Sequence, residues 1–141
     1  MDDATIINAA TCAVRDPSYQ VVFPSTLPEV LSQLRSPNTS GMFRVKGEAT
    51  AEYVVFLAFR SVFDVENGFP AGLLEALQRS LLSEQVLVEI VRKPNRPDIE
   101  DILTQDRGVF VFLGGLWKEK EWMRDLLIPI VQAGVNVYND M

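Results

Sequence analysis

Three carboxylates lie close together where a glycine pair leads into a predicted helix. They are Glu119, Glu121 and Asp125, downstream of Gly114-Gly115. A carboxylate can act as a general acid when burial tunes its pKa. Two of these residues, however, belong to a Lys-Glu-Lys-Glu run, which is typical of a solvated face. We therefore assign no catalytic residue, and we keep the three carboxylates as weak candidates.

Four other residues are candidates for contact with a ligand. Gly114 and Gly115 could let an anion approach a helix N-terminus, although a turn that needs glycine explains them more simply. Trp117 could stack on a ligand, but large aromatic side chains mainly supply buried area. Arg60 ends an apolar run, where it could contact an anion or form a surface ion pair.

The composition excludes several kinds of site. The 141-residue chain has no histidine and a single cysteine, Cys12. A Ser-His-Asp or Cys-His triad is therefore excluded. Zinc and redox metals lack a ligand set, and carboxylates could hold Mg²⁺ but show no motif for it, so we predict no metal site. The net charge of −6 argues against nucleic acid as a partner. Since no apolar run approaches about 20 residues, we predict no membrane association and expect a soluble cytoplasmic, or at least intracellular, protein.

Short apolar runs alternate with helical periods from residue 53 onward. Strands are predicted at 53–60, 86–91, 109–113 and 135–138. Helices are predicted at 69–83, at 98–105 and after residue 116. This alternation predicts an α/β fold, flavodoxin-like, with a parallel sheet and helices on both faces. Gly134 is expected to stop the last helix, and Pro129 is expected to end or kink it near Leu127.

The first 40 residues are predicted to form an α+β extension packed on the domain formed by residues 41–141. Helices are expected at 3–14 and from about residue 26 to 34, with a strand at 19–23 between them. A further strand is expected at 42–46, followed by a turn at 47–50. The apolar faces of the two helices would lie in water unless the extension packed on the rest of the chain.

The run Tyr53-Val-Val-Phe-Leu-Ala-Phe-Arg60 resembles the first strand of Toll/interleukin receptor (TIR) domains, especially the plant type. Other segments keep the order and spacing of that family through residue 141. The matching segments are 53–60, 74–77, 112–117 and 134–140, together with Phe69 and Trp122. The resemblance implies a TIR-like α/β domain over residues 53–141.

One departure bears on function. NAD-cleaving members of that family place a glutamate four residues after the tryptophan, and this chain has Leu126 there. Leucine cannot hold a ribose hydroxyl or stabilise an oxocarbenium ion. The resemblance therefore implies a non-catalytic association module, without a cofactor, that acts in signalling or assembly through a protein partner or self-association.

Two alternatives stay open. The first is an NAD-cleaving or nucleotide-binding enzyme whose acid is displaced to Glu119, Glu121 or Asp125. The second is a structural subunit of a larger assembly, such as a virion or a secretion machine. Association measured by light scattering would favour the module or the subunit, and release of nicotinamide from NAD by a monomer would favour the enzyme.

Overall fold

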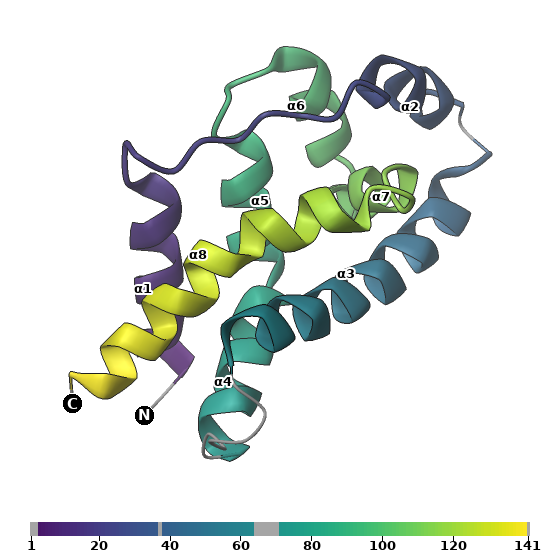
Figure 1. Ribbon diagram of the computed structural model, residues 1–141. Helices are drawn as coiled ribbons and strands as arrows, with labels where there is room; N and C mark the ends of the chain where they lie inside the picture. Colours follow the sequence, from purple (N-terminus) through teal and green to yellow (C-terminus); the bar gives the residue numbers. More distant parts are fainter. Residues whose placement is uncertain (1–2, 37, 64–70, 141) are drawn as a thin grey trace.

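The computed structural model describes residues 3–36, 38–63 and 71–140, and these residues form helices without any strand (Figure 1). In chain order the helices are α1 (Asp3–Arg15), α2 (Leu27–Leu34), α3 (Ser40–Val62), α4 (Ala71–Leu81), α5 (Glu84–Arg92), α6 (Pro97–Leu103), α7 (Gly108–Gly115) and α8 (Lys120–Asn139). The predicted α/β fold with a parallel sheet is therefore wrong. The same holds for the four strands predicted after residue 53, because each of those segments is helical.

Helix α7 is the buried centre of the fold. All residues from Gly108 to Gly114 are buried, and α7 contacts α2, α3, α5 and α6. A helix surrounded on all sides is apolar all round. Its sequence then shows no helical period, and a short apolar run of this kind looks the same as a buried strand. This is why the strand predicted at 109–113 is wrong.

Helix α3 replaces two predicted strands and the turn between them. It runs unbroken for 23 residues, through the segments 42–46, 47–50 and 53–60. Gly47, expected in the turn, lies inside the helix against α7. A Cβ atom on Gly47 would lie 1.7 Å from the carbonyl oxygen of Phe110, so this glycine serves close helix packing instead of a turn.

Helices α5 and α8 contain the other two segments predicted as strands. In α5 the buried residues recur at helical spacing, with Val86, Leu87, Ile90 and Val91 facing the core. Helix α8 continues through Pro129, which is exposed, and through Gly134, which is buried. A Cβ atom on Gly134 would lie 2.3 Å from Cδ2 of Leu77, so this residue also provides room for a neighbouring helix.

The N-terminal helices are part of the same hydrophobic core. Helix α1 packs against α4, α5 and α8, and α2 packs against α6 and α7 (Figure 1). The predictions of helices at α1, α2, α4 and α6 are confirmed, although residues 69 and 70 of the helix predicted at 69–83 lie outside the described residues. The predicted strand at 19–23 is wrong, because this segment is irregular.

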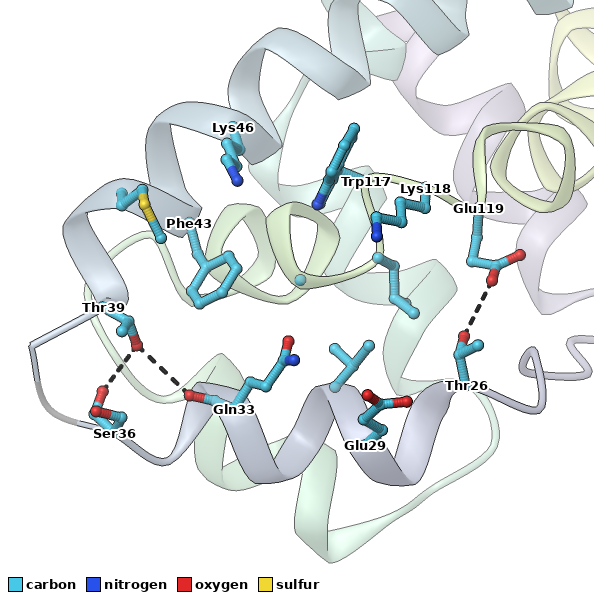
Figure 2. Close-up of a pocket in the computed structure, with 14 residues that line it drawn as sticks. Thr26, Glu29, Gln33, Ser36, Thr39, Phe43, Lys46, Trp117, Lys118 and Glu119 are labelled. Atoms are coloured by element: carbon cyan, nitrogen blue, oxygen red, sulfur yellow. Dashed lines mark hydrogen bonds between the residues drawn. The ribbon is translucent and has the colours of Figure 1, made fainter.

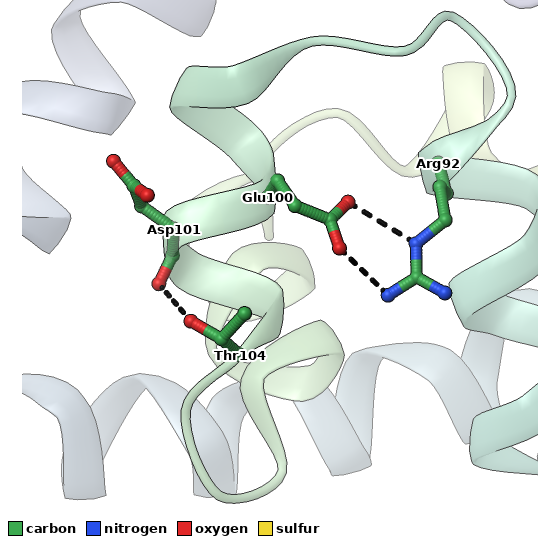
Figure 3. Close-up of polar contacts among 4 residues, drawn as sticks. All are labelled: Arg92, Glu100, Asp101 and Thr104. Carbon is green, nitrogen blue, oxygen red and sulfur yellow. Dashed lines mark hydrogen bonds and ion pairs between the residues drawn. The ribbon is translucent and has the colours of Figure 1, made fainter.

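Polar contacts join neighbouring helices at the surface. Arg92 of α5 donates two hydrogen bonds to the carboxylate of Glu100 of α6, at 2.8 and 3.1 Å (Figure 3). At the C-terminal end of α6, the hydroxyl of Thr104 donates to the carbonyl oxygen of Asp101 (Figure 3). Because the Arg92 and Glu100 side chains are about half exposed, this pair adds little stability.

In the described parts of the chain, no helix has the length and apolar character needed to cross a membrane.

Candidate functional site

The outer face of α3 carries four large apolar side chains that are half or more exposed. The exposed fractions are 51% for Met42, 59% for Val45, 50% for Tyr53 and 54% for Phe56. Together with Ala49, these residues recur at steps of three or four and therefore share one side of the helix. The opposite side is buried against α7. We call Met42, Val45, Tyr53 and Phe56 the α3 stripe.

A groove of about 580 Å³ adjoins the N-terminal end of the α3 stripe. It lies between α2, the first turns of α3 and the turn that joins α7 to α8. Met42 belongs both to the stripe and to the lining of the groove. Figure 2 shows Lys46, Trp117 and Lys118 on one side of the groove, with Glu29 of α2 on the opposite side.

Three lysines surround the indole ring of Trp117. The Nζ atoms of Lys46, Lys118 and Lys120 lie 5.1, 5.5 and 5.5 Å from the ring centroid. Contacts at this range are attractive because an ammonium group interacts with the π face. Lys120 also lies 5.8 Å from the ring centroid of Tyr53, which links this group to the α3 stripe. We call these three lysines and Trp117 the Trp117 cluster.

Two threonine hydroxyl groups donate hydrogen bonds between segments that line the groove. Thr26, just before α2, donates a hydrogen bond of 3.0 Å to Oε1 of Glu119, just before α8. Thr39, just before α3, donates one of 2.9 Å to the carbonyl oxygen of Ser36. Figure 2 shows both contacts at opposite ends of the groove. They hold the ends of α2 in position relative to α3 and α8.

The three weak catalytic candidates are spread over the start of α8. Glu119 lines the groove. Glu121 is exposed in the first turn of α8. Asp125 is exposed, accepts a hydrogen bond from Arg124 and borders a different hollow, beside Tyr19. The structure therefore does not bring the three carboxylates together at one site.

The four ligand candidates also occupy different surroundings. Gly115 and Trp117 line the groove. Gly114 is buried where α7 meets α3. Arg60 is exposed near the end of α3, with its guanidinium carbon 5.9 Å from the ring centroid of Phe56. Both glycines are the last residues of α7, so neither opens a helix N-terminus.

Sequence reasoning missed the α3 stripe and Lys46. The signal was available, because Met42, Val45, Ala49, Tyr53 and Phe56 follow steps of three and four. Dividing this segment into two strands and a turn hid that spacing. The lysines of the Trp117 cluster come from two segments about 70 residues apart, and only the fold brings them together.

Leu126, at the position that the resemblance gives to a catalytic glutamate, is partly buried against the core. Its carbonyl oxygen accepts a hydrogen bond of 3.0 Å from the hydroxyl of Tyr19.

Comparisons with protein-family models, with curated proteins and with solved structures found no match. The resemblance to TIR domains stays a sequence-based prediction, whereas the α/β fold that it implied is wrong. Function is therefore inferred from the α3 stripe, the groove and the Trp117 cluster.

Proposed function

We propose that this chain binds another protein through the α3 stripe and acts as an association module. The observation that carries the proposal is a helix with two apolar faces, one buried on α7 and the other exposed. Burial of a large apolar side chain is worth roughly 1.5–3 kcal/mol relative to its exposure. A row of such side chains on a protein surface marks an interaction site.

The residue types in and around the stripe support this proposal. Tyrosine, phenylalanine and methionine are enriched at the centres of protein interfaces, whereas lysine is depleted there and found at the rim. The stripe supplies Met42, Tyr53 and Phe56. Lys46 and Lys120 lie at its edge through their contacts with Trp117 and Tyr53. This arrangement is that of an apolar centre with a charged border.

Catalysis has less support on this surface. Of the carboxylates proposed as a displaced acid, only Glu119 reaches the groove, and it is held by the Thr26 hydroxyl. Glu121 is exposed in the first turn of α8 and does not line the groove, and Asp125 borders the hollow beside Tyr19. Neither of the other two carboxylates lines the groove with Glu119, so the NAD-cleaving alternative has less support than association.

A photo-cross-linkable residue in place of Phe56 tests the proposal in cells that naturally make the protein. The same residue in place of Gln78, which is exposed on α4, is the control. We expect the Phe56 position to join the chain to one defined protein, and adding Tyr53→Ser to reduce the yield at least fivefold. Light scattering of the purified chain shows whether that protein is a second copy.

Two results together would contradict the proposal. The first is a purified chain that stays monomeric at every concentration. The second is cross-linking from the Phe56 position that does not exceed cross-linking from the Gln78 position. Release of nicotinamide from NAD by that monomer would favour the enzyme instead.

A further inference from the structure

We infer that the partner bound by the α3 stripe is an acidic protein segment, whose carboxylates contact the Trp117 cluster while its apolar side chains cover the stripe and enter the groove. This inference rests on the proposed function and adds the chemistry of the partner. It follows from the charge of the cluster, the absence of a salt bridge between its lysines and any described carboxylate, and the groove beside it.

The Trp117 cluster concentrates positive charge on an acidic protein. All three ammonium groups lie within 5.5 Å of one ring centroid, so no two of them are more than about 11 Å apart. The chain as a whole has a net charge of −6. Exposed charges are only partly screened when they are closer than the Debye length, which is about 8 Å at physiological ionic strength and longer at low salt. The three lysines therefore form a local group of positive charge beside a groove that Glu29 and Glu119 also line.

No carboxylate of the described residues forms a salt bridge with Lys46, Lys118 or Lys120. Glu119 is adjacent in sequence but accepts a hydrogen bond from Thr26. Glu29 belongs to the facing wall of the groove (Figure 2). The indole ring gives the three ammonium groups a π contact but no counter-charge. A carboxylate from another molecule would supply one.

The groove gives an apolar side chain a place next to that charge. Its volume of about 580 Å³ is in the range of sites that hold small ligands or side chains. Met42, Phe43 and Leu116 contribute apolar surface to its lining. Lys120 joins the cluster to Tyr53 of the stripe. One continuous surface therefore combines an apolar strip, a hollow and a positive border.

A second copy of the chain is a poor match for this surface. A two-fold interface uses the same patch of both subunits. Two copies that met through this face would bring both lysine clusters into one interface, where like charges repel. An acidic segment of a different chain could cover the α3 stripe with its apolar side chains and place its carboxylates beside the lysines of the Trp117 cluster.

Binding of synthetic peptides to the purified chain tests the inference. The probe is a peptide with leucines at every third or fourth position and glutamates at most others, and its control carries glutamine in place of glutamate. The chain is used as the Trp122→Phe variant, because Trp117 is then the only tryptophan left of the two. We expect the glutamate peptide to change the fluorescence of Trp117 and to bind at least tenfold more tightly than the glutamine peptide at low salt.

Two sets of substitutions show whether the cluster is responsible. Replacing Lys46, Lys118 and Lys120 by glutamine should remove the tenfold preference. The control replaces three arginines on other surfaces by glutamine, which changes the net charge by the same amount, and it should keep the preference. These arginines are Arg15, Arg92 and Arg96, all in ion pairs and none of them lining the groove.

Three outcomes would overturn the inference. If both peptides bind equally and Phe56→Ser abolishes binding, the stripe binds protein without preference for acid, and the proposed function stands. If neither peptide binds while the Phe56 cross-link forms, the partner has a different chemistry. If vesicles of anionic lipid bind through the three lysines and the peptides do not, the surface binds a membrane.

Discussion

Gly47 of α3 and Gly114 of α7 lie back to back where the two helices cross. A Cβ atom on Gly47 would be 2.9 Å from the amide nitrogen of Gly114, and one on Gly114 would be 3.0 Å from that of Gly47. The same added atoms would lie 1.7 and 1.8 Å from the carbonyl oxygens of Phe110 and Phe43. The two backbones are therefore in direct contact, and this contact fixes which face of α3 is buried and which becomes the stripe.

Gly47→Ala should destabilise the protein by about 3 kcal/mol or more. The added methyl group would meet backbone atoms, and these cannot move aside as a flexible side chain can. The helices α3 and α7 would have to separate at the centre of the core. Urea denaturation followed by circular dichroism measures the change in the free energy of unfolding.

Gly41→Ala is the matched control for this prediction, because Gly41 belongs to the same helix. An added Cβ atom there has no neighbour within 4 Å. We expect a change within about 0.5 kcal/mol, as for most surface substitutions. A loss below 1 kcal/mol for Gly47→Ala would show that the two helices do not touch at this crossing.

The helices that could be predicted from the sequence are those with one polar face. Leu27, Val30, Leu31 and Leu34 of α2 recur at helical spacing and are all buried. Polar residues between them face water, so the period is visible without knowledge of the fold. The same argument accounts for the correct predictions of α1, α4 and α6.

Two of the helices predicted as strands, α7 and α3, are apolar on more than one side, whereas α5 has one polar face and was misread despite its helical spacing. Helix α7 is surrounded by protein, and α3 is apolar both toward α7 and toward solvent. Valine and phenylalanine in such segments also favour strands, and tertiary packing decides between the two structures. Of the candidate site, Trp117 and Gly115 were identified from sequence, but the contact of Trp117 with Lys46 depends on the fold.

Arg107 provides a second test of backbone geometry. It has a φ of 55°, in the left-handed region that costs a non-glycine residue roughly 1–2 kcal/mol. Its guanidinium donates to Glu48 of α3 at 3.0 Å and to Glu84 of α5 at 3.5 Å. All three side chains are about 40% exposed, so each ion pair contributes modestly.

We expect Arg107→Gly to be more stable than Arg107→Ala by about 1 kcal/mol, because only glycine relieves the left-handed backbone. Both variants lose the same ion pairs, so the difference between their free energies of unfolding reports the cost of the left-handed backbone conformation. Thermal and urea denaturation of the two variants measure it. An alanine variant as stable as the glycine variant would contradict the positive φ at this position.

Tyr19 should make stability depend on pH in the alkaline range. Burial raises the pKa of its phenol above the ordinary value of about 10. Below pH 10 the phenol is protonated in both the folded and the unfolded chain, so its contribution is fully present. Above pH 10 the unfolded chain loses a proton that the folded chain keeps, and the free energy of unfolding falls by about 1.4 kcal/mol per pH unit.

Tyr19→Phe isolates this contribution from that of Lys93, whose ammonium group lies 4.8 Å from the ring centroid of Tyr19. At pH 8 the variant should be less stable by about 1 kcal/mol, because it loses the hydrogen bond to the carbonyl oxygen of Leu126. The difference should shrink and reverse as the pH approaches 11. Urea denaturation at pH 8, 9.5 and 11 tests this, and parallel pH curves for the two proteins would refute it.

Val54 and Phe56 distinguish the helix from the strand that the sequence first indicated. Residues two apart lie on the same face of a strand but about 200° apart around a helix. In α3, Val54 is 1% exposed and belongs to the hydrophobic core, whereas Phe56 is 54% exposed in the α3 stripe. If this segment is a helix, truncating Val54 should lower the free energy of unfolding much more than truncating Phe56. If it were a buried strand, the two losses should be similar.

We expect Val54→Ala to destabilise the protein by about 2 kcal/mol, through the loss of buried methyl groups and the cavity left behind. Phe56→Ala should change stability by about 0.5 kcal/mol or less, because alanine favours the helix and little buried contact is lost. Urea denaturation gives both values. Comparable losses at the two positions would contradict the helix, and with it the α3 stripe. A large effect of Phe56→Ala on association, at unchanged stability, would show that this side chain serves the surface and not the fold.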